Sequence, residues 1–131
     1  AIVGVVSVAS PWAAARNTDA AYEALGRGDL SAARSDAKRA RSLNPLALDP
    51  LRAEAAVAEA QARGQDALEL YVKAVELQPE NWQSWYELAR FEQAVGLRDA
   101  ATRHATRAAQ LDPKNPIIFE LINALATQTG P

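Results

Sequence analysis

One short phrase occurs three times in this chain at a fixed interval. The segments ARSLNP (40–45), AVELQP (74–79) and AAQLDP (108–113) share the pattern Ala-x-x-Leu-x-Pro, and their prolines are 34 residues apart. Such regular spacing predicts a structural unit that is repeated along the chain. Because proline cannot continue a helix, the phrase marks the end of each unit and is not itself a site.

The composition favours an all-helical domain. Alanine, the strongest helix former, accounts for 30 of the 131 residues. A chain of this length is sufficient for one domain with a buried core. The net charge of −2 argues against a nucleic-acid binder. The absence of cysteine excludes disulfides, thiolate catalysis and thiolate metal sites.

Each 34-residue interval divides into two segments with apolar residues at helical spacing. The predicted helices cover residues 11–27 and 30–43, 50–62 and 65–77, and 82–95 and 98–111. Glycines at the predicted breaks tolerate the left-handed conformation that ends a helix; they are Gly28, Gly64 and Gly96. Predicted helix starts follow the polar residues Ser10, Asp49, Asn81 and Asn115.

The pattern resembles the tetratricopeptide repeat (TPR), a 34-residue helix–turn–helix unit. In the third unit Trp85, Leu88 and Ala89 match the first-helix positions of the family, and GDL at 28–30 is similar to its turn. The first two units depart from the pattern, with Asn17 and Leu51 in place of the first-helix tryptophan.

The resemblance implies an all-α, TPR-like right-handed superhelix of three helix–turn–helix repeats and a C-terminal capping helix. The repeats are expected at 14–47, 48–81 and 82–115, after an apolar segment at 1–13 and before the capping helix and tail at 116–131. The expected core residues are Tyr71, Leu77, Trp85, Leu88, Leu111, Ile118 and Ile122.

The resemblance also implies that the first helix of each pair lines a concave groove that binds a protein or peptide segment. Candidate groove residues are Asp19, Tyr22, Asp49, Arg52, Glu59, Gln83, Tyr86, Glu87, Arg90 and Gln93, with Thr18 also expected to be exposed. Alternatively, these residues are only solvated side chains of a scaffold. The lysine and asparagine that chaperone-binding members use to hold a terminal carboxylate are absent at the matching positions, so chaperone tail peptides are not expected ligands.

No catalytic, cofactor or metal constellation is evident in the sequence, so we expect no enzyme activity, cofactor or metal. His104, the single histidine, is expected at the surface between Arg103 and Arg107. The glutamates, Glu87 and Glu92 among them, have the spacing of solvated helix faces. A basic ridge of Arg34, Lys38 and Arg41 on the outer side is either solvated or able to meet lipid headgroups or an acidic partner.

The first 15 residues carry no charge, and IVGVVSV at 2–8 is strongly apolar. This run either packs on the domain or is the end of a membrane span, with Trp12 at the interface and residues 1–12 acting as a tether. An apolar segment followed by Pro-Trp and a short repeat array also resembles the C-terminal region of bacterial O-antigen ligase/polymerase-like membrane proteins. That resemblance implies a soluble domain anchored at the bacterial inner membrane.

Three functions are therefore open. The chain is a non-enzymatic protein-binding module, an accessory domain of a membrane glycan-transfer protein, or a structural spacer that self-associates.

Overall fold

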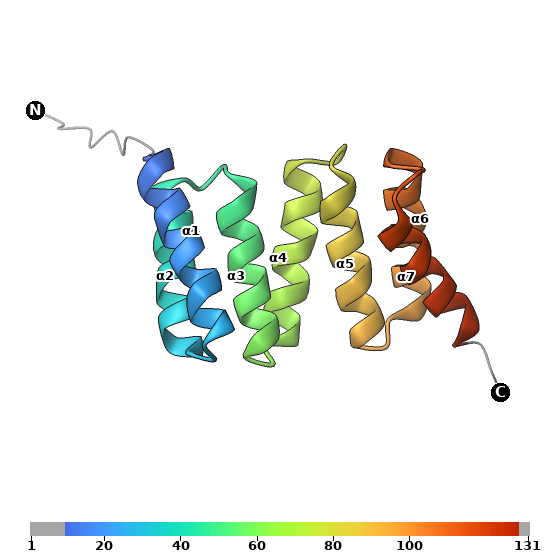
Figure 1. Ribbon diagram of the computed structural model, residues 1–131, viewed down its shortest axis with the longest axis horizontal. Coiled ribbons are helices and arrows are strands. Elements are labelled where there is room, and N and C mark those ends of the chain that lie inside the picture. Colours follow the sequence, from blue (N-terminus) through green and yellow to red (C-terminus); the bar gives the residue numbers. More distant parts are fainter. Residues whose placement is uncertain (1–9, 129–131) are drawn as a thin grey trace, which may run out of the picture. The chain divides into compact units, whose positions relative to one another are not determined.

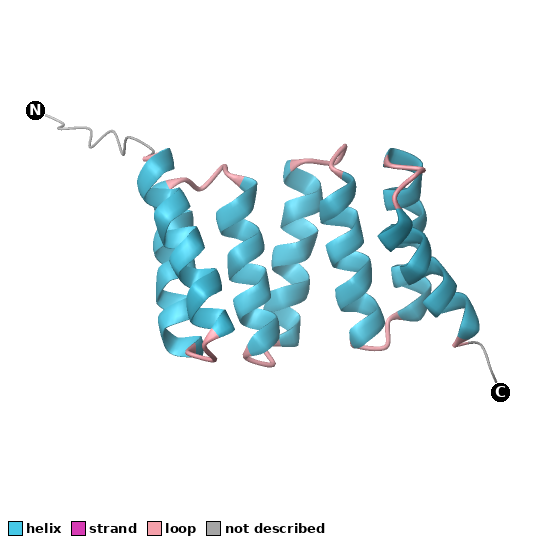
Figure 2. Ribbon diagram, viewed as in Figure 1, coloured by secondary structure: helices cyan, strands magenta, loops and turns pink. Residues whose placement is uncertain are grey.

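The computed structural model describes residues 10–128, and these form seven α-helices and no strand (Figures 1 and 2). The all-α fold predicted from the sequence is confirmed. In order, the helices are α1 (Pro11–Gly26), α2 (Leu30–Leu43), α3 (Leu48–Ala60), α4 (Gly64–Leu77), α5 (Trp82–Ala94), α6 (Arg98–Leu111) and α7 (Pro116–Thr127).

The helices group into two compact units, and each is considered by itself. Helices α1, α2 and α3 belong to the first unit, and α4 to α7 to the second, with the division between residues 63 and 64. The proposed repeat boundaries remain predictions. The apolar run at 2–8 lies outside the described residues.

The core of the first unit consists mainly of alanine. Helix α1 packs on both α2 and α3, and α2 also packs on α3. The contacts are made by fully buried small side chains together with Val57, namely Ala21, Ala24, Ala33, Ala37 and Ala53. Small side chains let helix axes approach closely, so a well-packed core forms here with few large residues.

The second unit combines alanines with larger apolar side chains. Helix α5 packs on α4, α6 and α7, and Ala89, Ala101 and Ala105 meet Leu121 and Leu125 in one cluster. Tyr71, Leu88 and Ile118 are buried as predicted from the sequence.

The other predicted core residues of this unit, Leu77, Trp85, Leu111 and Ile122, are only partly buried. The reason for Trp85 is its hydrogen bond: its Nε1 donates to the backbone oxygen of Pro79, 2.8 Å away, at the accessible start of the helix.

The helix pairs turn through one repeated backbone arrangement at positions 28, 62 and 96, which are 34 residues apart. Gly28 and Gly96 have φ of 76° and 85°, and Ala62 has φ of 56°. At Ala62 the backbone N–H donates to the oxygen of Glu59, and the N–H of Arg63 donates to that of Ala58. This pair of bonds is the Schellman ending of a helix. Gly64 instead begins α4, so the predicted break at Gly64 was wrong by two residues.

Two of the predicted helix starts are confirmed by side-chain bonds. The side chains of Asn81 and Asn115 accept hydrogen bonds from the backbone N–H groups of Gln83 and Ile117. Asp49 was wrongly predicted as a cap, because α3 begins at Leu48 and Asp49 lies in its first turn. A carboxylate there is still favourable, since the first turn has a positive electrostatic potential.

A buried carboxylate joins α5 to α6. Glu92 has 4% of its side chain exposed, and its Oε2 lies 2.7 Å from Nδ1 of the half-buried His104. The ring of Trp85 lies 5.5 Å from the His104 ring, centroid to centroid. The prediction of a solvated Glu92 was therefore wrong, and His104, expected at the surface, is partly exposed. The two side chains satisfy each other, which is the condition under which a carboxylate can be buried.

We expect Ala62→Gly to stabilise the chain. Glycine adopts positive φ without the strain that alanine has there, but it loses more conformational entropy on folding. The net increase in the free energy of unfolding is roughly 0.5–1 kcal/mol. Urea unfolding measures the difference. The matched control is Ala15→Gly, at an exposed position in the second turn of α1, which should lose about 1 kcal/mol. Equal losses in both variants would contradict the left-handed assignment.

We expect His104→Ala to destabilise the chain by about 3 kcal/mol, because it removes the imidazole that lies 2.7 Å from the buried Glu92 carboxylate. The double variant Glu92→Leu, His104→Leu should be more stable than this single variant, since two apolar side chains need no partner. Urea unfolding of both tests the pair. A single variant as stable as the parent would mean that Glu92 is solvated.

Candidate functional site

The groove residues expected from the sequence lie on three helices. Asp19 and Tyr22 are on α1, and Asp49, Arg52 and Glu59 are on α3, both in the first unit. The other five are on α5, in the second unit: Gln83, Tyr86, Glu87, Arg90 and Gln93. A single surface that contains both Arg52 and Arg90 stays a prediction.

A cavity of about 180 Å³ lies in the first unit, where α1 passes the start of α3. Its walls are mostly short or apolar side chains, and two of its residues are carboxylates. The lining residues are Pro11, Ala14, Ala15, Thr18, Asp19, Asn44, Ala47, Asp49 and Pro50. The volume is below the ~300–1,000 Å³ that is usual for cofactor and drug-sized ligands, so it suits one side chain of a larger ligand.

The two carboxylates of this cavity differ in their surroundings. Asp19 is exposed on α1 and has no ion-pair partner among the described residues. Asp49 is also exposed, and its Oδ1 lies 3.4 Å from Nη1 of Arg52, one turn along α3. This distance is longer than that of a strong charge-assisted bond. The cavity therefore presents one carboxylate without an ion pair and one that is weakly paired.

The remaining polar groups of the cavity are partly engaged within the protein. Thr18, which was predicted to be exposed, is 5% exposed, and its Oγ1 donates to the backbone oxygen of Ala14 at 2.9 Å. The backbone oxygen of Asn44 accepts from the N–H of Ala47. The cavity therefore offers an external ligand its two carboxylates and the side-chain amide of Asn44.

The groove candidates of the second unit make internal contacts. The Tyr86 side chain packs against the buried cluster of α5, α6 and α7, and its ring lies 6.3 Å from that of Trp82. Arg90 Nη2 lies 3.4 Å from the hydroxyl oxygen of Tyr71 on α4. Tyr71 in turn contacts Phe91, with ring centroids 5.3 Å apart. These side chains contribute to the packing of the unit, and Tyr86 and Arg90 are only partly exposed.

Asn44 and Ala47 were missed as site residues in the sequence. They lie in the segment 44–47 that connects α2 to α3, directly around the Pro45 of the repeated phrase. A segment between two helices is explained by helix termination alone, and the alanine side chain has no polar or charged group that would suggest a binding site. Of the cavity residues, only Thr18, Asp19 and Asp49 were named as candidates from the sequence.

Between residues 10 and 128 no group of three or more His, Cys, Asp or Glu side chains is placed to hold a metal ion. Within the same range, every helix is too short or too polar to cross a membrane.

No family model matches the chain, and no curated protein is similar to it in sequence. Solved structures are similar in fold. The first TPR domain of human RPAP3 gives a TM-score of 0.81 at 14% identity, over 90% of this chain and 93% of that domain. The fold is that of a TPR domain.

Two further structures with this fold contain a bound peptide. The first TPR of Spaghetti (RPAP3), bound to the HSP90 peptide SRMEEVD, has a TM-score of 0.81 at 12% identity and covers 92% of this chain and 96% of that chain. The type III secretion chaperone SycD of Yersinia enterocolitica, in complex with a peptide of the translocator YopD, has a TM-score of 0.75 at 12% identity. The match covers 88% of this chain and 94% of SycD in that structure. None of the three is a membrane glycan-transfer protein, so they add no support to the narrower resemblance.

Proposed function

We propose that this chain is a non-enzymatic module that binds a peptide segment of another protein, and that the first unit receives a basic side chain of that segment. The observation that carries the proposal is the α1–α3 cavity, which combines apolar walls with the carboxylates of Asp19 and Asp49. The peptide complexes of Spaghetti and SycD support the general mode, because helical repeats with the same fold hold peptides in both.

The shape and charge of the cavity suit lysine or arginine. The aliphatic stem of either side chain would lie against Pro11, Ala14 and Pro50, and its cationic end would reach the two carboxylates. Arg52 holds Asp49 only at 3.4 Å, so an incoming cation competes with a weak contact. An acidic segment such as the HSP90 peptide bound by Spaghetti would meet repulsion here.

We expect a peptide with one central lysine to bind more tightly than the same peptide with glutamate or norleucine at that position. Fluorescence anisotropy with labelled peptides measures the affinities. Because opposite charges interact across a partly solvated site, the preference for lysine should weaken as salt is added. Equal affinity for lysine and norleucine would contradict the basic specificity.

Asp19→Asn, Asp49→Asn should weaken binding of the lysine peptide about tenfold, equivalent to ~1.4 kcal/mol, and leave binding of the norleucine peptide unchanged. The matched control is Asp99→Asn, Glu120→Gln, which removes two exposed carboxylates from α6 and α7 in the second unit. If the control weakens binding as much as the cavity variant, the effect comes from net charge, and the cavity is not the site.

A further inference from the structure

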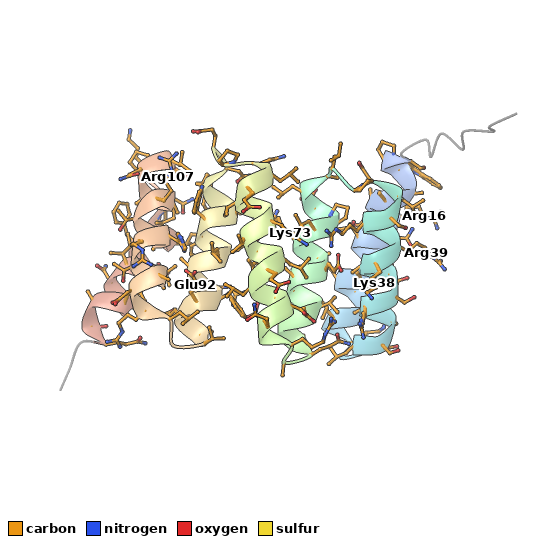
Figure 3. The ribbon with its side chains drawn as sticks, turned by 180° about the vertical axis from the view of Figure 1, so that it is seen from behind. Arg16, Lys38, Arg39, Lys73, Glu92 and Arg107 are labelled. Atoms are coloured by element: carbon orange, nitrogen blue, oxygen red, sulfur yellow. The ribbon has the colours of Figure 1, made fainter. Side chains whose placement is uncertain are left out.

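A second surface of the first unit combines an exposed indole with cations. Trp12, in the first turn of α1, is 70% exposed, and the guanidinium carbon of Arg16 lies 4.9 Å from the centre of the Trp12 ring. Lys38 and Arg39 are adjacent in sequence on α2, and Figure 3 shows Arg16 and Arg39 at the same edge of the unit. We call this surface the Trp12 face: Trp12, Arg16, Lys38 and Arg39.

The cations of the Trp12 face are not neutralised within the protein. In residues 10–128 no carboxylate pairs with Arg16, Lys38 or Arg39, whereas Arg41 of the same helix lies 2.8 Å from Glu54. The ridge of Arg34, Lys38 and Arg41 predicted from the sequence is therefore interrupted, because Arg41 is used to hold α3. Arg16 and Arg39, which have no ion pair between residues 10 and 128, lie beside the tryptophan.

The Trp12 face also has a shallow depression, lined by Trp12, Ala13, Arg16, Asn17, Ala20 and Arg39. None of these residues is acidic. A guanidinium that lies over an aromatic ring still has N–H groups in its own plane that can donate to an anion. An exposed indole costs free energy in water, and a ligand with both an apolar and an anionic part would remove that cost.

We infer that the Trp12 face binds an anionic lipid surface. Tryptophan is favoured at the level of the headgroups, where its ring is partly apolar and its N–H stays hydrated. Arginine and lysine beside it would bind the lipid phosphates. A soluble anion would explain the cations but leave the indole exposed. The apolar residues at 2–8, which end four positions before Trp12 in sequence, are also compatible with a nearby bilayer.

Vesicle flotation tests this inference. The full chain should float with phosphatidylcholine vesicles that contain phosphatidylglycerol, and much less with phosphatidylcholine alone. Arg16→Glu, Arg39→Glu keeps the apolar run at 2–8 and should weaken binding to anionic vesicles by more than about tenfold. The matched control is Arg98→Glu, Arg103→Glu on α6, which changes the net charge equally and should bind like the parent.

Trp12 itself provides a second measurement. Its emission should shift to shorter wavelength on anionic vesicles, and the shift should be absent in Trp12→Phe. Equal flotation of the parent and of Arg16→Glu, Arg39→Glu would overturn the inference, since binding would then come from residues outside this face. Binding to soluble polyglutamate, lost in the same double variant, together with no vesicle binding would also overturn it and indicate an acidic peptide.

Discussion

The close approach of paired helices at alanine is the constraint on which the rest of this structure depends. On α2 and α6, the contact positions are occupied by alanines with no exposed surface, Ala33, Ala37 and Ala40 in one unit and Ala101, Ala105 and Ala108 in the other. A larger side chain at any of these positions would push the helices apart or force strained rotamers. The alanines of α2 and α6 are 68 residues apart, which is two 34-residue periods. In the helix between them, α4, the matching positions are held by Ala67, Tyr71 and Ala74, and all three are buried.

This packing also determines which side chains of the first unit lie close enough together to form a binding surface. With the core made of small residues, α1 lies close enough to α3 for Asp19 of one helix and Asp49 of the other to line one cavity. The proposed peptide site needs no mobile loop, because both carboxylates are on helices. The Trp12 face uses α1 and α2 instead, so the first unit offers two surfaces with opposite charge.

The sequence predicted the helices well because the signals are local. Glycine at 28 and 96 and asparagine at 81 and 115 act within one turn of the backbone, and the structure places them as expected. Gly64 misled the prediction because Ala62, a residue with no turn signal, takes the left-handed position that the repeat requires. Here the packing of the repeat overrides local preference.

Side-chain roles were harder to predict because they depend on pairs of residues that are far apart in sequence. Glu92 looks solvated from its spacing alone and becomes buried only because His104 on the next helix is its partner. Likewise, Arg41 belongs to an apparent basic ridge until Glu54 of α3 binds it. The cavity was predicted only in part: Asp19 and Asp49 were named as candidates, whereas Asn44 and Ala47 in the α2–α3 connection carry no sequence signal of a site.

Amide chemical-shift mapping tests the proposed peptide site most directly. The full chain is titrated with a peptide that carries a single lysine, and the backbone amides are followed by NMR. The account predicts the largest shifts at the cavity residues Ala15, Asp19, Ala47 and Asp49, and none on α6. Shifts confined to the second unit, or to Trp12, Arg16 and Arg39, would contradict the assignment of peptide binding to the α1–α3 cavity.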